Sequence, residues 1–147
     1  CTTGRAGGPR GAAMPETRSH AVQHAPPPSA SGEYVVERID QVMYDFSELT
    51  FVTRHGCEPW DDLIVKLMLK WPGLHYSTSA FAPKYYPQSI IDYANTRGAD
   101  KIIYAGYFPM GLHIDTIFEQ LPNVPFRDHV WPQFLRENAM RVLKLES

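Results

Sequence analysis

Residues 49–78 of the chain read LTFVTRHGCEPWDDLIVKLMLKWPGLHYST, and this stretch decides the fold. Two short apolar runs, at residues 49–53 and 74–78, flank apolar positions that recur at helical spacing from Trp60 to Trp71. The runs predict strands, and the recurring positions predict a helix that buries one face. Because a helix separates the two strands, we expect them to lie parallel in one sheet.

The same alternation extends over most of the chain. Apolar spacing predicts a helix around Ile39 before the first strand, a third strand at residues 101–105, and further helices opening near Pro87, Ile114 and Pro132. A complete (β/α)8 barrel needs about 250 residues. The chain has 147 residues, so the sequence predicts an α/β fold that is either a small three-layer domain or a partial TIM barrel, its last three βα units plus C-terminal helices.

The first 32 residues differ from the rest in composition. They hold five of the 13 prolines and five of the 10 glycines, but none of the aromatic residues. A segment with so little apolar surface cannot offset the entropy of ordering it, so we expect residues 1–32 to be disordered and residues 33–147 to form the barrel part. A proline-rich ligand is the alternative for this segment. Because the chain opens with Cys1 rather than Met, we also expect it to be a fragment.

Charge and cysteine content exclude several classes of protein. The chain has 14 Lys and Arg against 16 Asp and Glu, a net charge of −2, so we expect no binding to nucleic acid or to an anionic membrane. Two cysteines are too few for a disulfide framework. No apolar run or N-terminal leader predicts membrane insertion or export. The expectation is a cytoplasmic protein, with a homo-oligomer as an open alternative.

The loop after the first strand carries the strongest candidate for chemistry. In parallel α/β proteins, active residues gather where strands end and helices begin. His55 stands there, with Arg54 and Glu58 beside it. The histidine could be a metal ligand or a general base, or it could only support the next helix. Cys57 is expected to be a buried, inert thiol rather than a nucleophile.

The loops after the other two strands give weaker signals. Residues 77–87 combine hydroxyl groups, aromatic rings and one lysine, which would suit a substrate with a carboxylate or simply a packed loop. Residues 105–111 carry two glycines that could admit a phosphate, but their spacing favours a tight aromatic turn. No H-x-H, H-E-x-x-H or C-x-x-C motif is present, so the chain as written lacks a complete metal site.

Residues 34–145 resemble the C-terminal part of the amidohydrolase-related family, the metal-dependent TIM-barrel hydrolases that also include aminocarboxymuconate-semialdehyde decarboxylase. Three segments carry the resemblance to the sixth, seventh and eighth strands of that family, and a fourth resembles its closing helices. They are FVTRHG at 51–56, WPGLHYSTS at 71–79, ADKIIY at 99–104 and VWPQFLRENAMRV at 130–142.

The resemblance implies roles for particular residues. His55 matches the histidine of the sixth strand, which binds metal or assists the activation of water. Tyr107 falls where the family has the aspartate of a G-S-D-x-P motif, and a tyrosine, with a pKa near 10, cannot replace that carboxylate at neutral pH. Arg54, Glu58 and Tyr107 are then expected to contact substrate. The first-strand and fifth-strand histidines of the family have no counterpart in this sequence.

The sequence therefore predicts a fragment of a metal-dependent hydrolase, or of a related decarboxylase, acting on a small organic substrate through metal-activated water. A divalent metal, zinc above all, is expected in an intact relative, with none bound by this chain alone. The alternative is a barrel that has lost its metal site and serves as a binding or assembly module. A gene-model fragment without independent function is the third possibility.

Overall fold

The computed structural model describes residues 31–145, with side chains from Arg38 onward. The segment predicted to be disordered lies almost wholly outside the described residues. The first helix, α1, spans Ser31–Asp45. It lies beside the following helix, where Asp40 accepts hydrogen bonds from Lys70 Nζ at 2.8 Å and from the indole nitrogen of Trp71 at 2.6 Å. These two bonds hold the pKa of Asp40 below its usual value.

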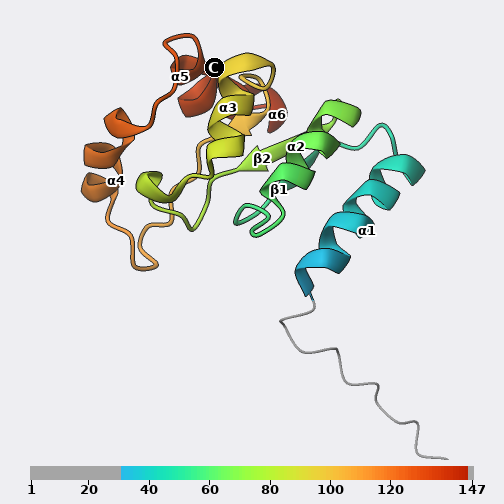
Figure 1. Ribbon diagram of the computed structural model, residues 1–147. Helices are drawn as coiled ribbons and strands as arrows, with labels where there is room; N and C mark the ends of the chain where they lie inside the picture. The colour runs from blue at the N-terminus through green and yellow to red at the C-terminus, as the bar shows by residue number, and fades with distance from the viewer. Residues whose placement is uncertain (1–30, 146–147) are drawn as a thin grey trace, which may run out of the picture.

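Three parallel strands form the sheet of the molecule (Figure 1). They are β1 (Phe51–Thr53), β2 (Leu74–Ser77) and β3 (Ile102–Ile103), and they lie in the order β1-β2-β3. Each strand falls within its predicted run and is shorter than it. The residues at the ends of the predicted runs lie in loops instead. The amide of Ala105, for example, donates a hydrogen bond to the side chain of Thr78 at 3.3 Å.

Helices separate the strands, as the alternation predicted. The chain runs through α2 (Asp61–Lys70), α3 (Gln88–Thr96) and α4 (Ile114–Gln120), with 3-10 turns at Pro83–Tyr85 and Leu121–Asn123. It closes with a continuous helical segment formed by α5 (Val130–Pro132), a π-helical turn (Gln133–Glu137) and α6 (Asn138–Val142).

One face of the sheet carries the hydrophobic core. Residues paired across parallel strands point to the same side, and the register pairs Phe51 with Leu74 and Tyr76 with Ile102. These four residues belong to one apolar cluster with side chains of the helices. The fully or nearly fully buried helix residues in that cluster are Met43, Ile64, Met68, Ile90, Ala94, Ile117, Val130 and Phe134. This packing holds the three parallel strands in register, so their carboxyl ends lie together at one edge of the sheet.

The buried stripe of the C-terminal helix differs from the predicted one. The helical spacing of Trp131, Leu135, Ala139 and Val142 in the sequence predicts that these four residues face the core. In the structure, Leu135 is 40% exposed and Phe134 is completely buried. The π-helical turn is the physical reason, since it adds a residue to one turn and rotates the buried positions.

That buried stripe also closes the outer edge of β3. The carbonyl of Phe134 accepts the amide of Tyr104 at 2.9 Å, and the buried amide of Asn138 donates to the carbonyls of Ala99 and Ile102 at 2.7 and 2.8 Å. These bonds satisfy backbone groups that a further strand would otherwise pair. Within residues 31–145, no helix has the length and apolar character needed to cross a bilayer.

Candidate functional site

The carboxyl ends of the three strands bring together one residue from each following loop: His55 after β1, Ser79 after β2 and Tyr107 after β3. The rings of His55 and Tyr107 lie perpendicular to one another, with their centroids 5.2 Å apart. The hydroxyl of Ser79 lies 3.2 Å from Nδ1 of His55. The structure thus joins two predicted site residues, His55 and Tyr107, in direct contact.

The backbone at the end of β1 is turned sharply to place His55. His55 and Gly56 have φ angles of +60° and +62°, in the left-handed region. A Cβ atom on Gly56 would lie 2.7 Å from the hydroxyl oxygen of Tyr76, so this position requires glycine for space as well as for conformation. A left-handed histidine is uncommon, and the surrounding contacts must hold it there.

Arg54 and Glu58 lie in the same loop with exposed side chains. They are accessible at the edge of the sheet where His55 lies, and their assignment to substrate stays a prediction. Glu58 does influence its neighbours: burial raises the pKa of Asp61 above its usual value, and the charge of Glu58 raises it further.

Cys57 has the properties of an inert thiol. It is free and half-buried, and burial, reinforced by the charge of Asp61, raises its pKa to about 11. A thiol with that pKa stays protonated at neutral pH, and the thiolate is the nucleophilic form. The interpretation of Cys57 as structural is therefore favoured over nucleophilic catalysis.

The loop after β2 is packed. Thr78 is buried, and its hydroxyl oxygen accepts hydrogen bonds from the amide of Ala105 and the hydroxyl of Tyr86, both at 3.3 Å. Ser79 is the functional neighbour that the sequence reasoning did not single out. Its position after β2 could have identified it from the sequence, because side chains that follow adjacent parallel strands meet at one edge of the sheet.

His75 lies inside β2 rather than at its end, and it is 4% exposed. Burial lowers its pKa to about 4, and the positive charges of Lys101 and Arg141 act in the same direction. The Nδ1 atom of His75 has no hydrogen-bond partner among the described residues. This histidine is neutral at physiological pH and contributes to the packed interior.

The described residues do not fit a metal ion by themselves. Across residues 31–145, no group of three or more His, Cys, Asp or Glu side chains is arranged to hold one. A zinc site takes about three or four such ligands. His55 is the predicted ligand that stands at the strand ends, and Tyr107 occupies the place of the expected carboxylate.

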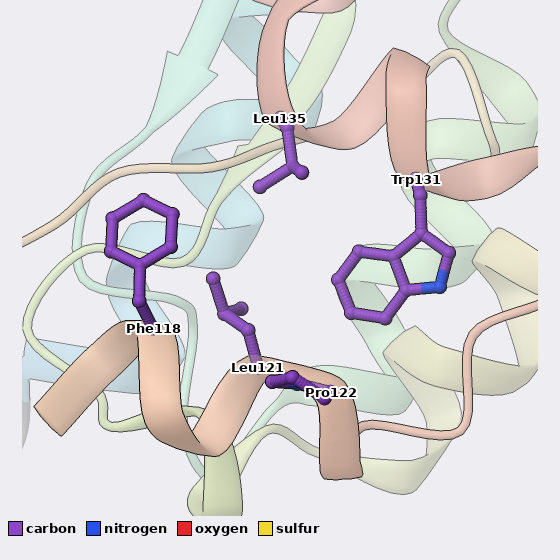
Figure 2. A pocket seen from close by; sticks show the side chains of 5 residues that line it. All are labelled: Phe118, Leu121, Pro122, Trp131 and Leu135. Atoms are coloured by element: carbon purple, nitrogen blue, oxygen red, sulfur yellow. The ribbon is translucent and has the colours of Figure 1, made fainter. Parts of the chain in front are cut away.

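A separate hollow lies between α4 and the C-terminal helix (Figure 2). It has a volume of about 400 Å³ and is lined by Phe118, Leu121, Pro122, Trp131 and Leu135. Figure 2 shows Phe118 and Leu121 on one side and Leu135 and Trp131 on the other, facing across the space. None of these side chains is ionisable, so the hollow offers apolar contact and no acid–base chemistry.

Comparison with known proteins supports the fold and leaves the chemistry open. No protein family and no curated protein matches the chain. Among solved structures, it is similar to an uncharacterized TIM-barrel protein from Bordetella bronchiseptica, with a TM-score of 0.65 and 28% sequence identity. The match covers 74% of this chain and 39% of that protein.

The chain therefore spans well under half the length of the barrel protein that it resembles. Its parallel three-stranded sheet and this similarity confirm the predicted α/β fold with the architecture of a partial TIM barrel. TIM-barrel enzymes place their active sites at the carboxyl ends of the strands. His55, Ser79 and Tyr107 occupy those ends here.

Proposed function

We propose that this chain is the C-terminal part of a TIM-barrel hydrolase of the amidohydrolase-related kind, or of a related decarboxylase, that acts on a small organic substrate. The observation that carries the proposal is the placement of His55 at the carboxyl end of β1 with a left-handed backbone, against Tyr107 from the end of β3. Active sites of TIM-barrel enzymes are formed by side chains at this edge of the sheet.

In this proposal His55 is the group that hydrogen-bonds the reacting part of the substrate, because an imidazole nitrogen can donate or accept a hydrogen bond. Tyr107 packs against the ring, and Arg54 and Glu58 are the charged side chains that could contact a polar substrate at the rim. The complete enzyme would also use a divalent metal ion, with zinc as the first candidate. The described donor set does not fit that ion, so its ligands would have to come mainly from other residues.

The test is an activity screen of the intact barrel protein that carries this sequence, with and without added zinc or manganese, against small esters, amides, lactones and carboxylates. Hydrolysis is followed by acid release and decarboxylation by release of carbon dioxide. Turnover that disappears in His55→Ala and persists in His113→Ala would support the proposal, since His113 is an exposed histidine at the start of α4. Equal activity of the wild type and His55→Ala on every active substrate would contradict it.

A second candidate function is a binding or assembly module built on a barrel that has lost its metal chemistry. The observation that favours it is Tyr107, which stands at the position of the expected aspartate and packs edge-on against His55. Metal analysis of the intact barrel protein that carries this sequence separates the two. About one zinc or manganese ion per intact chain favours the enzyme, and no bound ion together with a defined homo-oligomer favours the module.

A further inference from the structure

The hydroxyl of Ser79 makes two contacts with the same residue. Its oxygen accepts the backbone amide of His55 at 2.9 Å and lies 3.2 Å from Nδ1 of the His55 ring. Ser79 is 8% exposed, so bulk water has little access to it. A buried polar group of this kind is expected to direct its hydrogen at a partner.

The direction of the ring contact follows from counting donors and acceptors. A serine hydroxyl has one hydrogen to donate and two lone pairs that accept. The backbone amide of His55 uses one lone pair of Ser79 Oγ. Of the described groups, Nδ1 of His55 is the acceptor within reach of that hydroxyl hydrogen. A neutral imidazole that accepts at Nδ1 carries its own hydrogen on Nε2.

The backbone conformation of His55 and its packing against Tyr107 also restrict the ring. The backbone of His55 has a φ of +60°, which any side chain other than glycine adopts at a cost of about 1 kcal/mol or more. The hydrogen bond from the backbone amide of His55 to Ser79 Oγ helps to hold that conformation, since it links the His55 backbone to the loop after β2. The ring of Tyr107 lies perpendicular to the imidazole and packs against it.

We propose that Ser79 is a positioning residue that fixes neutral His55 as the Nε2–H tautomer. This inference rests on the function proposed above and sharpens the role of His55 in it. With Nδ1 engaged by Ser79, the nitrogen left for a substrate is Nε2, and it presents a hydrogen. His55 then serves as a hydrogen-bond donor to a substrate oxygen, such as that of a carbonyl or carboxylate group. Binding of a metal ion through Nε2 would require the opposite tautomer.

The tautomer is measurable by nitrogen-15 NMR on the full chain with labelled histidine, at a pH above which the His55 signal no longer changes. His55→Asn assigns the signal. The wild type is expected to show His55 with its hydrogen on Nε2 alone, and Ser79→Ala is expected to show the Nδ1–H form as well. Ser79→Thr keeps the hydroxyl and should retain the wild-type pattern. Ser89→Ala, a serine replacement in α3, is the matched control.

A wild-type signal with the hydrogen on Nδ1 would overturn the inference, and so would a Ser79→Ala signal identical to that of the wild type. Should Ser79→Ala fail to fold, the tautomer of the wild type and of Ser79→Thr still decides. The measurement needs no substrate. Absence of turnover in the wild type would therefore count against the proposed function alone, whereas a wrong tautomer would count against the role of Ser79 alone.

Discussion

The burial of His75 predicts a specific loss of stability in acid. This side chain is 4% exposed inside β2, and burial, with help from the charges of Lys101 and Arg141, lowers its pKa from 6.5 to about 4. Asp100 acts in the opposite direction but does not restore the ordinary value. The folded chain therefore binds a proton at His75 less readily than the unfolded chain does.

The sign and size follow from linkage. Between pH 6.5 and pH 4 the unfolded state binds a proton at His75 and the folded state does not, so stability falls as the pH falls through this window. With pKa values of 6.5 unfolded and about 4 folded, lowering the pH from 8 to 4.5 removes about 2.5 kcal/mol of unfolding free energy through this one group. That is a large part of the stability of a small domain.

The assay is urea unfolding of the wild type and His75→Asn at pH 8 and pH 4.5, followed by far-ultraviolet circular dichroism. The substitution replaces the imidazole with an amide that does not titrate, so the variant should lose about 2.5 kcal/mol less than the wild type on acidification. His113→Asn is the control, because His113 is exposed and should leave the loss unchanged. The reasoning is refuted if wild type and His75→Asn lose the same free energy between the two pH values.

Three further predictions concern the core, the sheet edge and the thiol. Phe134→Ala should lower the unfolding free energy by about 3–5 kcal/mol, and Leu135→Ala by less than about 1 kcal/mol, because Phe134 is fully buried and Leu135 is exposed. Thermal and urea unfolding of the two variants measure this difference. Asn138→Ala should cost about 2–3 kcal/mol, since it leaves two strand-edge carbonyls without their donor, and a loss under about 0.5 kcal/mol would contradict this. In a Cys1→Ser chain, Cys57 should react with iodoacetamide at pH 7.5 only after unfolding, because burial raises the pKa of the Cys57 thiol to about 11. Mass spectrometry follows the alkylation, and rapid alkylation of the folded chain would contradict this prediction.

Local patterns were enough to predict the architecture. Alternation of short apolar runs with helical stripes predicted the three strands, their parallel pairing and the helices between them. It left a small three-layer domain and a partial barrel open, and the similarity to a solved TIM-barrel protein favours the barrel. Because the carboxyl ends of parallel strands share one edge, the placement of His55 and Tyr107 at the same edge of the sheet was also predictable. The residues of the loop after β2 left substrate binding and packing as alternatives, and the structure shows Thr78 of this loop buried and bonded to the amide of Ala105.

The C-terminal helix shows where helical periodicity misleads. A stripe through Trp131 and Leu135 assumes that every turn holds 3.6 residues, whereas the π-helical turn Gln133–Glu137 holds more. The extra length turns Phe134 and Asn138 inward, and both then bond the outer edge of β3. Nothing in the local sequence signals that turn, since its benefit comes from a strand about 30 residues earlier in the chain.

The partner of His55 depends on register, which the sequence states only indirectly. Any of the three hydroxyl residues at 77–79 could follow β2 toward the histidine, and a slip of one residue would present a different one or reverse the side on which it points. The register of β1 with β2 ends at the pair Thr53 and Tyr76, and beyond it the left-handed turn at His55 brings the ring to Ser79, whereas Thr78 accepts the amide of Ala105. That register is set by burial of Leu74 and Tyr76 on the helix-covered face of the sheet. Tyr76 also lies against the turn that carries His55, since a Cβ atom on Gly56 would be 2.7 Å from its hydroxyl oxygen. The geometry available to His55 therefore depends on core packing at Tyr76, and changes in that packing should alter the site.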